Sequence, residues 1–213
     1  MVPSIRFALR GATLLAAVSG MVAATMPASA KAPFRDLNHN GKRDGYENPD
    51  LAVDRRLDDL IRRMTLEEKV ALMLHGTLQA EGGRGIGAGK AYDKASAQEL
   101  LSRGVNSFIT RLGPDPRTFA QENNAIQKLA EATRLGIPAT ISTDPRNHFA
   151  VTAGASSETG GFSQWPETLG MAAIGDEALV ERFGKLVAAE YRAVGIQMAL
   201  SPQADLFTEP RWP

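Results

Sequence analysis

The sequence has 213 residues, of which 43% are hydrophobic and 23% are charged, a composition typical of globular proteins. It contains no cysteine, which excludes disulfides, zinc sites with thiolate ligands and cysteine nucleophiles. The 24 basic side chains equal the 24 acidic ones in number, and this balance argues against a protein that binds nucleic acid.

The first 30 residues have the pattern of a secretory signal peptide. Two arginines precede an apolar run over residues 12–26, and residues 27–30 read Pro-Ala-Ser-Ala, a small-x-small cleavage pattern. The alternative is a membrane anchor, but the apolar run is shorter than the roughly 20 residues that cross a bilayer. We therefore expect cleavage after Ala30, export to a bacterial periplasm or the medium, and no membrane contact after cleavage.

A twelve-residue acidic segment follows the predicted cleavage site. Residues 36–47 match the calcium-loop pattern D-x-[DN]-x-[DN]-G-x5-E, in which side-chain oxygens and one backbone carbonyl surround a hard cation. The alternative is a polar turn within a linker over residues 31–50, because Arg43 takes a usually apolar position and no helix can precede the loop. The pattern predicts a structural Ca²⁺ site with the ligands Asp36, Asn38, Asn40, Lys42 (through its carbonyl), Asp44 and Glu47.

Helical periodicity begins at residue 51. Apolar residues at i, i+3, i+4 and i+7 predict a helix over residues 51–64 with one apolar face. Residues 65–68 read Thr-Leu-Glu-Glu, a capping box in which Thr65 and Glu68 satisfy free backbone amides. A second helix is therefore expected from residue 66 to about residue 74.

Residues 75–90 contain six glycines, which suggests a phosphate-binding loop. The details argue against this interpretation, because no G-x-G-x-x-G register and no G-K-[ST] sequence occurs. No strand is predicted before the glycines either. We expect this stretch to form a mobile surface loop.

The rest of the chain repeats one unit three times: a helix, a glycine that ends it, and a short buried strand. Such alternation predicts parallel strands with crossover helices, either in an open doubly wound sheet or in a (β/α)8 barrel. The expected helices start near residues 97, 117 and 177 and end at Gly104, Gly136 and Gly195, and the strands follow at 105–110, 137–142 and 196–200.

Polar segments follow each of these strands. Residues 111–113, 143–147 and 202–205 carry charged or polar side chains just after the strands, and in a barrel those strand ends form the active-site face. We therefore predict an α/β fold that is a partial (β/α)8 barrel with its first three or four βα units. A complete barrel takes roughly 250 residues, so we expect residues 51–213 to be the N-terminal portion of a longer domain.

The chain from Asp36 to Pro213 resembles glycoside hydrolase family 3, the exported β-glucosidases, β-xylosidases and related exo-acting enzymes. Four ordered motifs carry the resemblance, and the acidic loop over residues 36–47 also looks like one found in bacterial members. The motifs are the opening helices over 56–73, the strand and aspartate over 136–147, the Trp-Pro-Glu-Thr-Leu-Gly of 165–170, and Ser-Pro-Gln-Ala-Asp with Glu-Pro-Arg-Trp over 201–212.

The resemblance implies that Asp144 is the aspartate that accepts hydrogen bonds from hydroxyls of the terminal non-reducing sugar. An ordinary turn aspartate before Pro145 is the alternative. Arg146 and Asn147 could orient this carboxylate or touch the sugar, and Arg111 completes the predicted subsite. Two other residues lie in matching motifs: Asp205, expected to support the site from behind, and Arg211, which precedes the position of the family's sugar-binding arginine.

The catalytic carboxylates of the family have no counterpart in these residues. Its nucleophile is an aspartate in an S-D-W-like motif preceded by a Lys-His pair, and neither a Ser-Asp nor a Lys-His dipeptide occurs here. The resemblance thus implies an exo-acting retaining β-glycosidase that hydrolyses terminal β-linked sugars of oligosaccharides or aryl β-glycosides and needs no cofactor for catalysis. We expect its nucleophile and acid/base beyond Pro213, so this chain alone should be inactive. The alternative is a non-catalytic exported module that binds glycans or calcium.

Several other residues are weaker candidates. His75 and His148 lack a second ligand at helical spacing, which argues against a metal site. Trp165 and Trp212 could stack on a sugar or pack in the core. We expect structural roles for Glu158, Glu167 and Glu209.

Overall fold

The computed structural model describes residues 34–82, 89–148 and 161–202. The predicted signal peptide therefore lies outside the described residues. In the part of the chain that is described, no helix is long and apolar enough to span a bilayer.

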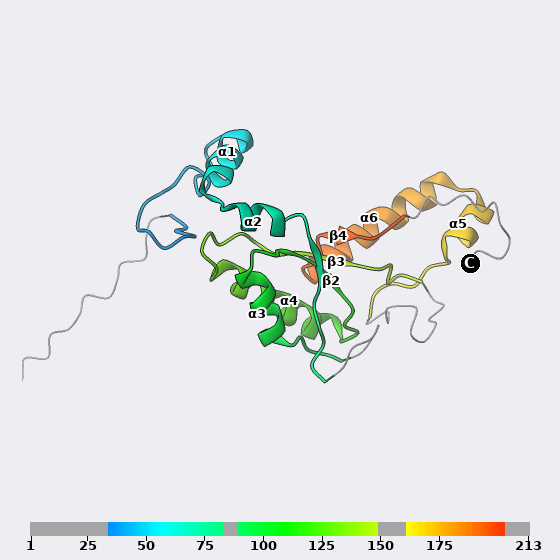
Figure 1. Ribbon diagram of the computed structural model, residues 1–213. Helices are drawn as coiled ribbons and strands as arrows, with labels where there is room; N and C mark the ends of the chain where they lie inside the picture. Colours follow the sequence, from blue (N-terminus) through cyan, green and yellow to red (C-terminus); the bar gives the residue numbers. More distant parts are fainter. Residues whose placement is uncertain (1–33, 83–88, 149–160, 203–213) are drawn as a thin grey trace, which may run out of the picture. The chain divides into compact units, whose positions relative to one another are not determined.

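Four parallel strands form one sheet (Figure 1). Their order in the sheet, β1-β2-β3-β4, is their order in the sequence. At least one helix lies between each pair of successive strands from β1 onward, so the predicted α/β class with a parallel sheet is confirmed. The strands are β1 (His75–Thr77), β2 (Ser107–Thr110), β3 (Thr140–Thr143) and β4 (Met198–Ala199).

Strand β1 corrects part of the expectation that residues 75–90 form a surface loop, because it occupies the first three of these residues. It is three residues long and contains Gly76, which pairs with Phe108 of β2. A Cβ at Gly76 would lie 3.2 Å from the Phe108 ring, so glycine allows this ring to pack against the strand. A strand this short has no alternation of polar and apolar residues that the sequence could reveal.

Six helices connect and flank the strands among the described residues, and three of the last four begin at an aspartate N-cap. Asp93, Asp115 and Asp176 each accept hydrogen bonds from backbone amides of the first turn. The capping box of Thr65 and Glu68 is also present. The helices are α1 (Val53–Arg63), α2 (Leu66–Ala71), α3 (Lys94–Ser102), α4 (Pro116–Glu131), α5 (Thr168–Ile174) and α6 (Glu177–Ala193).

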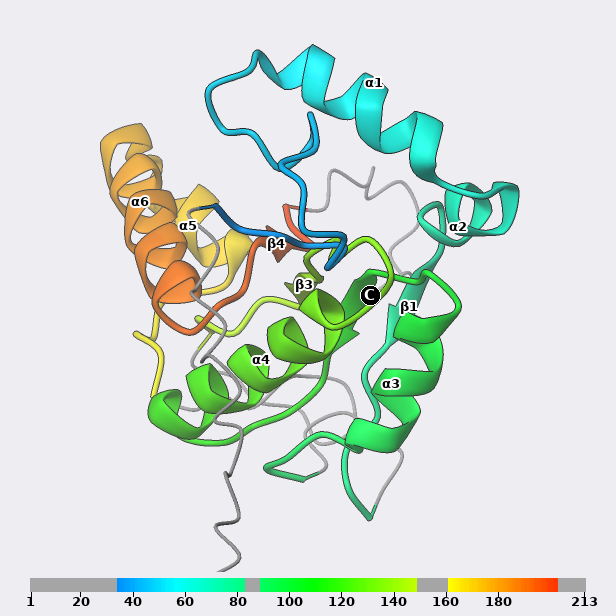
Figure 2. The ribbon, with the colours of Figure 1, turned by 90° about the vertical axis from the view of Figure 1, so that its left-hand side faces the viewer.

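The hydrophobic core lies between the sheet and the helices. Phe108 of β2 and Ile141 of β3 are paired in register and are fully buried. They belong to one cluster with Leu101 of α3 and Phe119 and Ile126 of α4. Figure 2 shows α3 and α4 side by side next to the strands. This packing fixes the C-terminal ends of β2 and β3 relative to each other.

The apolar side of α1 is not buried. The helix was predicted with one apolar face, yet none of its residues is buried and Leu57 is 48% exposed. Val53 and Ile61 on the same helix are exposed as well. The three exposed apolar side chains lie on one side of α1, at positions 53, 57 and 61.

The Glu68 carboxylate also joins α2 to the segment after α4. Arg134 donates from Nε to Oε1 of Glu68 (2.8 Å) and from Nη2 to Oε2, and it also donates to the backbone carbonyl of Arg63 (3.0 Å). These bonds hold the pKa of Glu68 below its ordinary value of 4.5, mainly through the Arg134 hydrogen bond. The stabilisation is therefore complete above pH 4.5 and is lost as the pH falls toward the lower native pKa.

Replacing Arg134 by methionine should lower the free energy of unfolding at pH 7 by about 1 kcal/mol. The effect is this small because the Arg134 side chain is 53% exposed and water screens the ion pair. The difference from the unmodified protein should shrink as the pH falls below 4.5, since Glu68 then becomes protonated in both states. Urea unfolding at several pH values measures this. The control is R103M, which removes the exposed Arg103–Glu99 pair and should change little. An R134M deficit that is the same at pH 3 and pH 7 would contradict the assignment.

Candidate functional site

Arg111 and Asp144 lie together at the carboxyl end of the sheet. Arg111 follows β2 directly and Asp144 follows β3, and Nη1 of the arginine is 3.6 Å from Oδ2 of the aspartate. Their side chains are 32% and 35% exposed, respectively. Two of the polar residues that follow neighbouring strands in the sequence thus lie next to each other in the structure.

The strand register explains why the two residues meet. Thr110 pairs with Thr143 at the last position of the β2–β3 ladder, and both threonines are fully buried. The next residue on each strand emerges from the sheet at the same level, because parallel strands place equivalent positions side by side. Two buried threonines therefore bring one cation and one anion to the surface together.

The Asp144 carboxylate has room for further hydrogen bonds. Among the described residues its polar contact is the Arg111 ion pair, and a carboxylate can accept about four hydrogen bonds. A partly exposed ion pair of this length contributes little stability, about 0–1 kcal/mol. The carboxylate is thus an available acceptor whose charge is partly balanced by its neighbour.

Arg146 lies inside the protein, with only 1% of its surface exposed. Its Nε donates to Oγ1 of Thr143 (2.7 Å), its Nη1 to the carbonyl of Leu112 (2.7 Å), and its Nη2 to the carbonyl of Thr110 (3.4 Å). The guanidinium carbon is 4.8 Å from the centre of the Phe119 ring. Burial lowers the pKa of Arg146, but an arginine stays charged at neutral pH. Of the two roles that the sequence left open for Arg146, its burial favours orienting the site over touching the sugar.

Asn147 is also buried, at 2% exposure, and its amide belongs to a polar cluster that the sequence did not reveal. Its Nδ2 donates to Oε2 of Glu190 (2.7 Å) and to the carbonyl of Ser163 (3.0 Å). Glu190 on α6 also accepts from the backbone and hydroxyl of Ser163 at 3.0 and 3.1 Å. These contacts connect the segment after β3 to α6 and place the Asn147 side chain inside the protein.

Tyr191 is a second residue of α6 that sequence reasoning missed. Its hydroxyl accepts a hydrogen bond from the backbone N–H of Arg146 (3.0 Å), and burial raises its pKa. Its ring packs edge-to-face on Phe162, with centroids 5.6 Å apart. The only sequence signal for Glu190 and Tyr191 was their position on a predicted helix, which does not say what each side chain meets.

The remaining candidate residues either contact other protein side chains or lie outside the described residues. Trp165 donates from Nε1 to Ser163 Oγ (3.0 Å) and lies against Phe183, which favours packing over sugar stacking. The His75 ring nitrogens are each 2.7 Å from a hydroxyl, Ser107 on one side and Ser142 on the other. Asp205, Glu209, Arg211, Trp212 and Glu158 lie outside the described residues.

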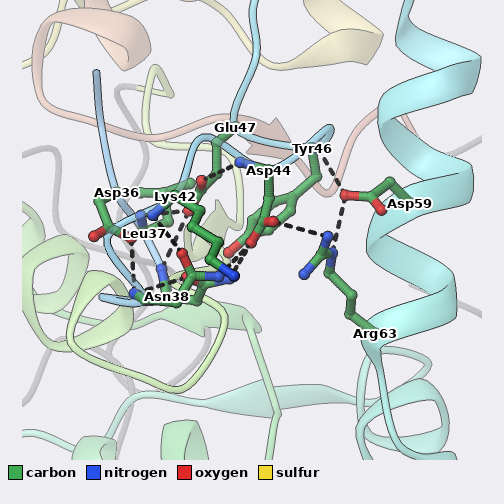
Figure 3. Close-up of polar contacts among 10 residues, drawn as sticks. Asp36, Leu37, Asn38, Lys42, Asp44, Tyr46, Glu47, Asp59 and Arg63 are labelled. Carbon is green, nitrogen blue, oxygen red and sulfur yellow. Dashed lines mark hydrogen bonds and ion pairs between the residues drawn. The ribbon is translucent and has the colours of Figure 1, made fainter. Parts of the chain in front are cut away.

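The predicted calcium loop folds back on itself (Figure 3). Glu47 accepts hydrogen bonds from the backbone amides of Leu37 and Asp44 at 2.7 and 2.9 Å, and Asp36 accepts from those of Asn40 and Gly41 at 3.1 and 2.8 Å.

Asp44 pairs through Oδ1 with Arg63 (2.9 Å), and its Oδ2 accepts from the Asn38 amide (2.7 Å). The backbone N–H of Lys42 donates to Oδ1 of Asn40 (2.7 Å). Within the described ranges, no group of three or more His, Asp or Glu side chains is arranged to hold a metal ion. The Ca²⁺ site therefore stays a prediction.

Comparison with known proteins shows which protein family this sequence belongs to. The sequence model of the family described as "Glycosyl hydrolase family 3 N terminal domain" matches residues 65–213. A periplasmic β-glucosidase/β-xylosidase of Dickeya chrysanthemi is 58% identical over 182 residues, which cover 84% of this chain and 28% of that protein. The β-glucosidase C of Emericella nidulans is 44% identical over 168 residues, 78% of this chain and 26% of that protein. This chain spans less than a third of either relative, and the match to the family model over more than half of its length shows that it belongs to glycosyl hydrolase family 3.

Proposed function

We propose that these residues are the N-terminal portion of the catalytic barrel of an exported, exo-acting, retaining β-glycosidase. Its substrates would be terminal, non-reducing β-linked sugars of oligosaccharides or aryl β-glycosides. The observation that carries the proposal is the Arg111–Asp144 pair at adjacent strand ends, in a chain that belongs to a glycosidase family.

The strand order supports a barrel over an open doubly wound sheet. A doubly wound sheet reverses its strand order at a switch point, where its ligands bind. The sheet here runs β1-β2-β3-β4 with every neighbour parallel, as successive units of a barrel do. The exposed apolar face of α1 is surface that additional units of a larger barrel would cover.

The chemistry of the pair suits the recognition of a sugar. A pyranose offers several hydroxyl donors, and an ionised carboxylate accepts two of them in a charge-assisted fork. Asp144 has this capacity free among the described residues, and the neighbouring Arg111 can itself donate to a sugar oxygen. In our proposal these two residues contact the terminal sugar.

We place the two catalytic carboxyl groups outside these residues. Retaining hydrolysis needs a nucleophile and an acid/base about 5 Å apart across the glycosidic bond. The family's nucleophile motif has no match in the sequence, which contains no Ser-Asp dipeptide. In our proposal, therefore, this chain supplies sugar contacts and no covalent chemistry.

Export to the periplasm is part of the proposal. It is supported by the charged, apolar and small-residue regions of residues 1–30, and by the name of the Dickeya relative, a periplasmic enzyme.

The intact mass of the protein that the source cell exports is the first test, followed by assays on aryl β-glucosides and β-xylosides. We expect a mass several tens of kilodaltons above that of residues 31–213, and NMR should show the β-anomer as the first product of hydrolysis. A mass equal to that of residues 31–213, with no hydrolysis, would overturn the proposal and leave a glycan- or calcium-binding module as the better description.

A further inference from the structure

The buried Arg146 side chain contacts the backbone on both sides of the partly exposed Arg111. Its Nη1 and Nη2 donate to the carbonyls of Leu112 (2.7 Å) and Thr110 (3.4 Å), the two residues that flank Arg111. Arg146 thus holds the backbone on either side of Arg111 from inside the protein. The Arg111 side chain itself forms the partly exposed ion pair with Asp144.

The same arginine also fixes the backbone around Asp144. Thr143, just before the aspartate, accepts from Nε of Arg146 (2.7 Å). Arg146 itself comes two residues after Asp144, and its backbone N–H donates to the Tyr191 hydroxyl (3.0 Å). Asp144 is therefore held by a side-chain contact on one side and a backbone contact on the other.

Only arginine can make this set of contacts. Its planar guanidinium presents five donors in a fixed fork, and three different acceptors use them here, one on β3, one on β2 and one two residues after β2. The flat face also rests over the Phe119 ring at 4.8 Å, an arrangement that a lysine ammonium does not reproduce with the same geometry.

We propose that Arg146 is a positioning residue that sets the geometry of the Arg111–Asp144 pair, and through it the orientation of the sugar-binding carboxylate. This rests on the proposed function, in which Asp144 contacts the terminal sugar. Because a hydrogen bond weakens steeply when its distance and angle depart from the ideal geometry, loosening two strand ends should weaken the binding of the sugar even though Arg146 touches no sugar.

A purely structural role for Arg146 makes a different prediction. A buried arginine could stabilise the fold without affecting recognition, and then any equally destabilising core substitution would have the same kinetic effect. The decisive quantity is therefore the change in KM at a matched loss of thermal stability.

The experiment uses the enzyme as its source cell produces it, with 4-nitrophenyl β-glucoside as substrate. R146M is compared with L101A, which removes core volume in α3 away from the pair. We expect R146M to raise KM about 10-fold or more with kcat changed less, R146K to recover part of the loss, and L101A to leave KM within about twofold at a similar Tm. An unchanged KM in R146M, or an equal rise in L101A, would overturn the proposal.

Two further variants keep the test decisive. T143V removes only the hydroxyl that accepts from Nε of Arg146 and should raise KM about threefold even if R146M does not fold; an unchanged KM in T143V would then overturn the proposal. D144N reports on the proposed function itself. If D144N raises KM and R146M does not, the positioning role alone fails; if D144N leaves KM unchanged, the sugar contact fails and the positioning role with it.

Discussion

Replacing Asp144 by alanine should lower kcat/KM for aryl β-glucosides by about 100- to 10,000-fold in the enzyme that the source cell produces. Each hydrogen bond from a sugar hydroxyl to an ionised carboxylate is worth about 1.5–3 kcal/mol, and the free acceptor sites of Asp144 allow two of them. Initial rates at several substrate concentrations measure kcat/KM. The ratio of kcat/KM between the unmodified enzyme and D144A gives the loss of transition-state stabilisation.

Asp115 provides the matched control for this prediction. It also follows β2, but its carboxylate caps α4 by accepting from the amides of Arg117 and Thr118, both at 3.1 Å. D115A should cost about 1 kcal/mol of stability and leave kcat/KM nearly unchanged. Equal kinetic losses in D115A and D144A would show that Asp144 acts through the fold and not through the sugar.

Replacing Glu190 by alanine should lower the free energy of unfolding by about 2–4 kcal/mol. The carboxylate accepts from the Asn147 amide and from the backbone and hydroxyl of Ser163, and these donors would lose their charged acceptor. A buried polar group without its partner costs about 1–3 kcal/mol, and more when the partner is charged. Urea unfolding at neutral pH measures the difference.

Glu181 lies on the same helix and serves as the comparison. It pairs with Lys185 at 2.5 Å, but both side chains are largely exposed. E181A should therefore change the free energy of unfolding by less than about 0.5 kcal/mol. A loss in E190A no larger than that in E181A would rule out the cluster as a source of stability.

The alternation of helices and strands could be predicted because its signals are local. Gly104, Gly136 and Gly195 each adopt a positive φ, at 89°, 59° and 80°, which glycine accepts without strain and which ends a helix. The predicted helix starts differ by no more than three residues from α3, α4 and α6. Each strand then begins within a few residues of its glycine.

The site was predicted only in part, for reasons that lie in tertiary packing. The position of Arg111 and Asp144 after two strands was visible in the sequence, since strand ends of a parallel sheet meet at one edge. That Arg146 points inward depends on the acceptors that β2 and β3 leave free and on the Phe119 ring of α4. One partner of Asn147, Glu190, lies on α6, 43 residues away in the sequence, and no local pattern specifies such a contact.

The way Arg146 holds the strand ends has a consequence for how specificity could diverge. Around residue 111 it uses backbone carbonyls as acceptors, and every amino acid has a backbone carbonyl. The side chain at position 111 can therefore be replaced without removing the hydrogen bonds from Arg146 that hold the backbone there. Variants with a neutral, aromatic or longer side chain at this position would keep the scaffold and alter only what the incoming sugar meets. If Arg111 contacts the terminal sugar as we propose, residue 111 is the place to begin when redesigning the preference for one sugar over another.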